Sequence, residues 1–252
     1  MVVLTYPCET AGLLLARLRC EGFAVSAVLL QRRNPAKRLQ ELVGAVGVRR
    51  TSSLAWEKLR AAFSRQTSEP WRNDDLYVSH AGQLVVVPRL NHPSCRDALL
   101  ALRPDVAVIG GAGILRPDIF QVPRLGTLNV HPGILPQYRG LSSICWAVLD
   151  GGEIGATVHF VDGGIDTGPI VARRLVDVRS GDTLCLLRRK VVDAGLDLLT
   201  DALDALARGE TLVTANQRRE EGRCYPMASA SLWRKAEGRL AALAKETTPD
   251  TG

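Results

Sequence analysis

Residues 128–136, LNVHPGILP, carry an apolar strand into a turn, and a second turn follows at residues 163–169, GGIDTGP. On the strand, Asn129 and His131 are two residues apart, so their side chains face the same side. Asp166 lies in the second turn, directly after another predicted strand. An amide, an imidazole and a carboxylate at strand ends, beside glycines that let a ligand approach the backbone, predict a reaction centre. Any one of these residues near a turn usually serves local hydrogen bonding, so the prediction rests on all three together.

Outward from these turns, apolar runs alternate with amphipathic helical patterns. This alternation predicts an α/β fold, a doubly wound and mostly parallel open sheet with helices on both faces. The strands are predicted at residues 2–5, 23–30, 84–87, 105–110, 127–131, 156–162 and 169–176. The helices are predicted at residues 9–20, 35–46, 93–102, 142–149, 182–207 and 229–245. Ser180 or Asp182 is the expected N-cap of the longest helix, and Gly209 follows its end.

The chain of 252 residues suits either one large domain or one domain with an appendage. We expect a catalytic domain over residues 1–209 and a C-terminal extension, mainly helical, over residues 210–252. Residues 47–80 carry little pattern, and a lid, a partner surface and a spacer all stay open for them. Residues 1–7 read as a first strand rather than a signal peptide, and no apolar run has the length of a membrane span, so a cytoplasmic protein is expected.

The sequence offers no pattern for a metal site. Its 6 cysteines and 4 histidines are dispersed without the spacing of zinc ligands, so no metal is expected. The net charge of +6 suits an anionic partner such as folate, a nucleotide-linked substrate, phosphate or RNA. No basic stretch is interleaved with aromatic residues, so nucleic-acid binding is not expected.

The motifs around the two turns resemble those of the formyltransferases that use 10-formyltetrahydrofolate. The resemblance is carried by residues 129–140, NVHPGILPQYRG, and by residues 155–170, GATVHFVDGGIDTGPI. A weaker match lies at residues 105–115, DVAVIGGAGIL, and the resemblance covers about half of the chain. Gly133 departs from the pattern, because many relatives have serine there.

The resemblance implies that Asn129, His131 and Asp166 are catalytic. Asn129 would donate a hydrogen bond to the oxyanion of the tetrahedral intermediate, and a protonated His131 would be a second donor. Asp166 would orient His131 and favour its charged form, or would relay a proton from the attacking amine to the leaving nitrogen. His159 lies inside a predicted strand, where packing rather than chemistry is expected.

The resemblance also implies 10-formyltetrahydrofolate as co-substrate, bound through backbone groups of two segments. These are Gly113, Ile114 and Leu115 after a central strand, and Val161, Asp162, Gly163, Gly164 and Ile165 in the second turn. Glycine-rich loops expose amide and carbonyl groups, and Ile114 and Leu115 can flank a flat ring. The Asp162 side chain is expected to support its loop. Tyr138 and Arg139 are expected as an exposed loop pair, which either contacts the acceptor or is ordinary surface polarity.

Among formyltransferases, the stand-alone enzymes that act on sugar nucleotide amino sugars match the size and layout best, and amino acids or natural-product amines stay open as acceptors. Residues 6–12 lack the glycine-rich loop expected for a glycinamide ribonucleotide acceptor. Residues 210–252 are too few for the C-terminal barrel of a methionyl-tRNA formyltransferase, and a formyltetrahydrofolate hydrolase would carry a further N-terminal regulatory domain. A homodimer through the terminal helix is also left open.

Two other classes of protein are compatible with parts of the sequence. An NAD(P)-binding oxidoreductase is suggested by GGAG at residues 110–113, but Arg116 stands where the third glycine of the dinucleotide fingerprint is needed. A silent folate-binding module on the same fold would not need Asn129, His131 and Asp166 together. An assay with 10-formyltetrahydrofolate and with NAD(P), with and without amines, discriminates among the three.

Overall fold

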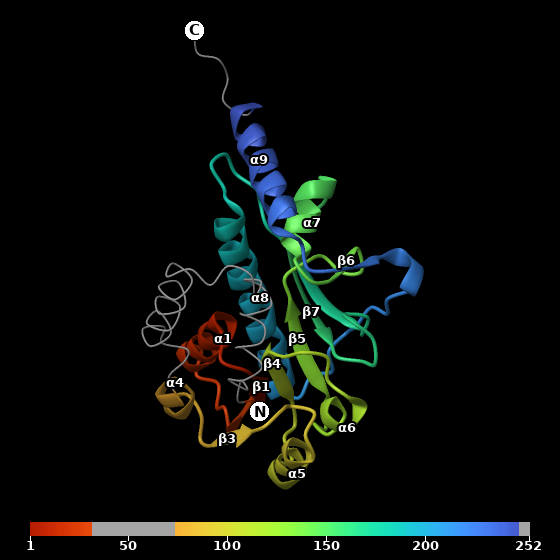
Figure 1. Cartoon of the computed structure of the whole chain (residues 1–252). Coiled ribbons are helices and arrows are strands. Elements are labelled where there is room, and N and C mark those ends of the chain that lie inside the picture. The colour runs from red at the N-terminus through yellow and green to blue at the C-terminus, as the bar shows by residue number, and fades with distance from the viewer. Residues whose placement is uncertain (32–73, 247–252) are drawn as a thin grey trace, which may run out of the picture. The chain divides into compact units, whose positions relative to one another are not determined.

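The computed structural model describes residues 1–31 and 74–246 (Figure 1). The chain divides into two compact units, Met1–Leu125 and Gly126–Gly252. The helix predicted at residues 35–46 and most of the segment at residues 47–80 lie outside the described residues. No described helix has both the length and the apolar character needed to cross a membrane.

The N-terminal unit contains a parallel sheet with the strand order β3-β2-β1-β4. Its strands are β1 (Val2–Thr5), β2 (Ala27–Gln31), β3 (Leu84–Val87) and β4 (Ala107–Gly111). Its helices are α1 (Glu9–Cys20), α4 (Asp74–Ser79), α5 (Pro93–Leu102) and α6 (Pro117–Phe120). All four residues of β1 are buried, as expected for a central parallel strand that is covered on both faces.

The strand order reverses at β1, because β2 and β3 lie on one side of it and β4 on the other. Ligands of open α/β sheets bind outside the carboxyl ends of the strands at such a switch point. Here these ends are joined by a hydrogen bond of 3.0 Å from the Tyr6 amide to the Gly111 carbonyl. Gly111 has φ 150° and lies so close to Cys8 that a Cβ would be 2.7 Å from its sulfur. The predicted binding segment at residues 113–115 begins at this edge.

The C-terminal unit contains two small sheets. The antiparallel strands β5 (Thr127–His131), β7 (Gly155–Phe160) and β8 (Ile170–Leu175) lie in the order β5-β7-β8, and β6 (Tyr138–Gly140) pairs in parallel with β9 (Arg223–Tyr225). Its helices are α7 (Ser143–Asp150), α8 (Leu184–Ala207), the 3₁₀ helix η2 (Arg219–Glu221) and α9 (Ala230–Glu246). The long helix α8 packs along β5, β7 and β8.

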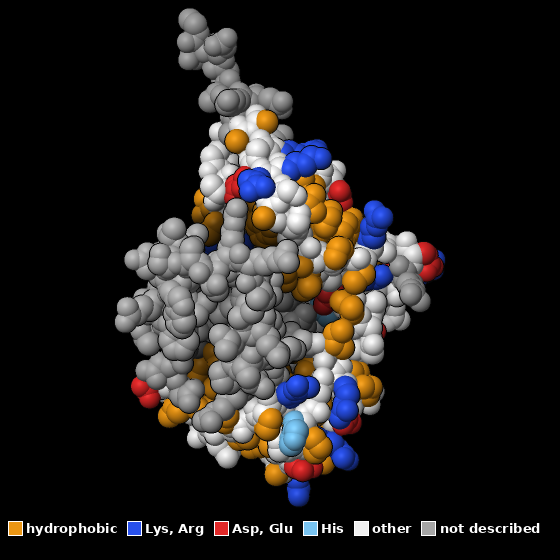
Figure 2. All heavy atoms as spheres, in the orientation of Figure 1, with side chains coloured by type: hydrophobic (Ala, Val, Ile, Leu, Met, Phe, Trp, Pro, Cys, Tyr) orange, Lys and Arg blue, Asp and Glu red, His pale blue; other side chains and the backbone are white. Residues whose placement is uncertain are grey.

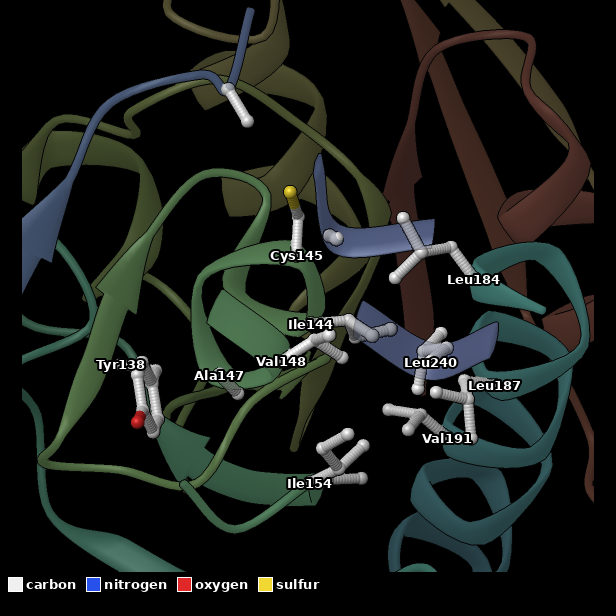
Figure 3. Close-up of a cluster of buried hydrophobic side chains, with 13 residues drawn as sticks. Tyr138, Ile144, Cys145, Ala147, Val148, Ile154, Leu184, Leu187, Val191 and Leu240 are labelled. Carbon is white, nitrogen blue, oxygen red and sulfur yellow. The ribbon is translucent and has the colours of Figure 1, made fainter. Parts of the chain in front are cut away.

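A hydrophobic cluster holds α9 against α7 and α8. Leu240 of α9 is buried and lies among Ile144 and Val148 of α7 and Leu187 and Val191 of α8 (Figure 3). Burial of such side chains contributes about 1.5–3 kcal/mol each. The last described helix is therefore packed into the C-terminal unit.

The α/β class, with a mostly parallel open sheet and flanking helices, is confirmed. Strand β2 begins at Ala27, later than predicted, because the Phe23 amide donates to the Leu18 carbonyl and closes the end of α1. The N-cap of α8 is Thr183, whose hydroxyl accepts from the Leu186 amide at 3.2 Å, so the prediction of Ser180 or Asp182 was wrong. Asp182 instead accepts from the Lys190 ammonium.

Candidate active site

The register of β5 and β7 places four polar residues side by side. Asn129 pairs with His159, and His131 pairs with Thr157, across the antiparallel strands. Residues directly opposite each other in such a ladder, and residues two apart along a strand, present their side chains on the same face. One face of this pair therefore carries an amide, two imidazoles and a hydroxyl.

The ring of His131 is 3% exposed and is held at both nitrogens. Its Nε2 lies 2.6 Å from the Tyr138 carbonyl oxygen, and since a carbonyl can only accept, Nε2 carries the hydrogen and donates it. The Ser143 hydroxyl is also 3.1 Å from Nε2. On the other side of the ring, Nδ1 lies 3.3 Å from Oδ2 of Asp166. In the neutral imidazole, Nδ1 is therefore the unprotonated nitrogen, and it faces a carboxylate.

Asp166 occupies a turn with φ 53°, a left-handed conformation that non-glycine residues adopt rarely. Its Oδ2 accepts a hydrogen bond of 2.9 Å from the Gly140 amide. Its Oδ1 lies 3.6 Å from Nε2 of His159. The backbone of this turn thus directs the carboxylate at both imidazoles.

Asn129 reaches the cluster through His159. Nδ1 of His159 donates to the Phe160 carbonyl at 2.8 Å, so its Nε2 accepts from the Asn129 amide at 3.1 Å. The structure therefore brings together the three residues predicted at the reaction centre, with His159 as the link between Asn129 and Asp166. His159 is buried in a strand, as expected, but its contacts also make it part of the site, which the sequence reasoning missed. The role of His159 depends on the antiparallel register of β5 and β7. The alternation of side chains along one strand does not show which residue of the neighbouring strand lies opposite.

Burial and neighbouring polar groups shift the pKa values of this pair in opposing directions. Burial lowers the pKa of His131, and this outweighs the opposing effect of the Asp166 carboxylate and of the Tyr138 carbonyl. Burial also raises the pKa of Asp166, but the neighbouring imidazoles of His159 and His131 and the Gly140 amide together bring that pKa below its usual range. Asp166 does favour the charged form of His131, as expected, yet the net direction favours a neutral ring. Acceptors face both ring nitrogens while burial opposes the charge, so a protonated His131 as a second oxyanion donor stays a prediction.

The two segments predicted to bind the co-substrate lie in different units. After β4, Ile114 is 67% exposed while Leu115 is buried, so only Ile114 offers its side chain to a ring. Asn91 holds this segment, because its amide donates to the Ile114 carbonyl at 2.8 Å and its oxygen accepts from the Arg116 amide at 2.9 Å. A Cβ built at Gly113 meets nothing within 4 Å, so its backbone is open to a ligand.

In the second segment, the Val161 amide donates to the Thr127 carbonyl at 2.8 Å, which ties the loop to β5. The Asp162 carboxylate accepts from the Gly164 amide at 3.0 Å and from the Thr167 hydroxyl at 2.7 Å. These bonds agree with a supporting role for the Asp162 side chain.

The tip of this loop is open to solvent. Gly163 has open space around it, and Ile165 is 43% exposed. Each segment by itself presents open backbone at a glycine and one exposed aliphatic side chain, groups that can contact a flat ring. Binding by these residues stays a prediction.

Tyr138 and Arg139 were expected as an exposed loop pair, and this expectation was wrong. They are 8% and 3% exposed, and they belong to β6, which pairs with β9 far along the chain. The Tyr138 ring stacks on Tyr225 at 5.6 Å, and the Arg139 guanidinium donates to Gln217 and to the Arg218 carbonyl. The partners come from the C-terminal segment, so the local sequence gave no signal for this burial.

Within the described part of the chain, no three histidine, cysteine, aspartate or glutamate side chains are placed to hold a metal ion. In the cluster of His131, His159 and Asp166, each imidazole uses one ring nitrogen for a hydrogen bond to a backbone carbonyl.

Gly133 has no room for a side chain, because a Cβ there would lie 2.7 Å from the Ser143 Cβ and 2.9 Å from His131 Nε2. We expect Gly133→Ala to lower the free energy of unfolding by about 1–3 kcal/mol, since the buried helix and ring have little freedom to move. Urea unfolding measures this change. Gly238→Ala is the control, because nothing lies within 4 Å of its Cβ in α9, and it should not destabilise the protein. An unchanged stability for Gly133→Ala would show that the packing at His131 is loose.

Comparison with known proteins identifies the family. Residues 68–203, more than half of the chain, match the model of the formyl transferase family, and the chain belongs to this family. A methionyl-tRNA formyltransferase of Roseiflexus sp. (strain RS-1) is 42% identical over an alignment of 143 residues, and the match covers 52% of this chain and 43% of that relative. The chain spans about half the length, or less, of the curated relatives it matches.

Solved structures share the fold at low identity. Glycinamide ribonucleotide transformylase 1 of Symbiobacterium toebii has a TM-score of 0.58 and 20% identity, with 86% of this chain and 93% of that chain covered. The N-formyltransferase of Helicobacter canadensis, in complex with folinic acid and dTDP-3-aminofucose, has a TM-score of 0.60 and 15% identity, with 100% and 84% covered. The α/β fold of this chain is therefore the fold of these formyltransferases.

Proposed function

We propose that this protein is an N-formyltransferase that moves the formyl group of 10-formyltetrahydrofolate to the primary amine of an acceptor. The observation that carries the proposal is the buried contact between His131 Nδ1 and the Asp166 carboxylate, beside Asn129 and His159. Membership of the formyl transferase family supports it. The co-substrate supplies the formyl carbon on a nitrogen that can leave.

The paired side chains suit removal of a proton from the acceptor. An amine attacks a carbonyl only in its unprotonated form, and it must lose a further proton as the new C–N bond forms. Nδ1 of His131 lacks a proton because Nε2 donates to the Tyr138 carbonyl. His131 Nδ1 and Asp166 Oδ2 are 3.3 Å apart, so a proton taken from the acceptor amine can lie between them in a hydrogen bond that both groups share. The same proton is then available to the folate nitrogen when the old C–N bond breaks, so the transfer is balanced.

Asn129 supplies a neutral donor beside this pair. Its amide nitrogen has two hydrogens, and His159 accepts one of them at 3.1 Å, which orients the group. The second hydrogen can stabilise the negative oxygen of the tetrahedral intermediate, and one such donor contributes about 3–4 kcal/mol in hydrolases. This assignment does not need a charged His131.

We propose a nucleotide-linked amino sugar as the acceptor. The net charge of +6 suits a phosphate-bearing substrate, and Arg234, Lys235 and Arg239 are exposed on α9, where Figure 2 shows basic side chains at the surface. The structural neighbour bound to dTDP-3-aminofucose lends support through its fold.

Methionyl-tRNA is the second candidate. The observation that favours it is the 42% identity to a methionyl-tRNA formyltransferase, which exceeds the identity to the structural neighbours. The same positive charge suits RNA.

A panel of acceptors tests the function. The protein is incubated with 10-formyltetrahydrofolate and, separately, with amino sugars linked to dTDP or UDP, with free amino sugars, and with charged methionyl-tRNA. Mass spectrometry detects the gain of one formyl group, and absorbance follows the loss of the donor. Formylation of a nucleotide-linked amino sugar supports the proposal, and formylation of methionyl-tRNA alone would replace the proposed acceptor. Loss of the formyl group to water only, without any formylated amine, would contradict transferase activity.

A further inference from the structure

We infer that Gln217, which lies beyond the matched motifs, is a positioning residue for Asp166, an inference that rests on the proposed function. Gln217 belongs to the segment between α8 and η2, in the predicted C-terminal extension. Its side chain bridges the turn that carries Asp166 and the buried guanidinium of Arg139. The extension thereby supports the reaction centre.

Gln217 uses both ends of its amide. Its Nε2 donates to the Asp166 carbonyl at 3.1 Å and to the Gly168 carbonyl at 2.6 Å. Its Oε1 accepts from Nε and Nη2 of Arg139, at 3.2 and 3.1 Å. Only an amide of this length offers two donors to the carbonyls and an acceptor to the guanidinium at once.

The hydrogen bonds from Gln217, called the bridge below, hold a turn whose backbone is strained. Asp166 has φ 53°, which persists in a non-glycine residue only when surrounding contacts hold it. The neighbouring backbone adds to this, because the amide and carbonyl of Ala215 pair with Ile170 at 2.8 Å. The Asp166 side chain reaches His131 and the Gly140 amide from this turn, so a relaxed backbone would move the carboxylate away from both.

The same segment supports the other side of the pair. Arg139 lies in β6 between Tyr138, whose carbonyl accepts from His131, and Gly140, whose amide donates to Asp166. Because Arg139 is 3% exposed and donates to Gln217, the bridge links β6 directly to the Asp166 turn. Gln217 therefore sets the distance between the two members of the pair.

Gln217→Ala is expected to lower kcat by about 10- to 100-fold with little change in KM, as a misplaced group does. A direct readout is NMR titration of the labelled imidazoles, which is practical with 4 histidines in the chain. Asp166 raises the pKa of His131, so His131 should titrate at a lower pH in the variant than in the wild type. Asn216→Ala, at an exposed neighbour, is the matched control and should change neither value.

Gln217→Glu keeps the size of the side chain and removes its hydrogen-bond donors, so it separates the effect of the hydrogen bonds from the effect of lost volume. It also tests the inference if Gln217→Ala does not fold. A carboxylate keeps the acceptor for Arg139 but has no hydrogen for the two carbonyls, so kcat should fall as in Gln217→Ala. A wild-type kcat in Gln217→Glu would overturn the inference. If the wild type formylates no amine, the proposed function fails, and the NMR titration still tests the bridge alone.

Discussion

Asp166→Asn should lower kcat for formyl transfer by about 10²- to 10⁴-fold, the range for loss of a proton-transfer group. Asparagine keeps the size of the side chain and an oxygen that can accept from the Gly140 amide, at 2.9 Å in the wild type. It removes the negative charge that lies 3.3 Å from His131 Nδ1. The neutral amide cannot share the proton taken from the acceptor, so turnover falls while the turn stays folded.

The pH profile of the residual activity provides a second readout for Asp166→Asn. The Asp166 carboxylate raises the pKa of His131, so its removal should shift the acidic limb of the kcat profile to lower pH. Asp177→Asn is the control, because Asp177 is exposed in the same unit and should leave kcat unchanged. A kcat near that of the wild type in Asp166→Asn would remove Asp166 from the mechanism.

His131→Ala should reduce kcat by a similar factor, about 10²- to 10⁴-fold. It also leaves the buried Tyr138 carbonyl without its donor, which costs about 1–3 kcal/mol of unfolding free energy. Steady-state kinetics and urea unfolding measure the two effects separately. His92→Ala is the control, since His92 caps α5 through the Ser94 amide and its loss should cost stability without loss of turnover.

The double variant of His131 and Asp166 shows whether they act as one unit. Two groups that hold the same proton are expected to be strongly non-additive, so the double variant should be about as slow as either single variant. Multiplied losses would mean that each residue acts independently. That outcome would contradict the shared proton at Nδ1 and Oδ2.

Much of the candidate site could be predicted from the sequence pattern. Period 2 on a strand placed Asn129 and His131 on one face, and the glycine-rich turn placed Asp166 at a strand end. The structure brings their side chains together within one unit. The fold class followed from the alternation of apolar runs and helical patterns, which depends on local sequence alone.

What the sequence did not reveal depends on contacts between distant segments. The antiparallel pairing of Asn129 with His159 makes His159 part of the site. The pairing of β6 with β9 buries Arg139. The depressed pKa of His131 follows from burial, which is a property of packing rather than of residue type. Each of these results needs a three-dimensional arrangement that no short motif encodes.

A single-turnover experiment with 10-formyltetrahydrofolate labelled in the formyl carbon tests the central claim most directly. Wild-type protein, Asp166→Asn and His131→Ala are each mixed with labelled donor and the best acceptor from the panel, and donor binding is measured in parallel. The account predicts rapid appearance of label on the acceptor amine with the wild type, and slow appearance with both variants despite unchanged donor affinity. Equal transfer rates in all three proteins would contradict it.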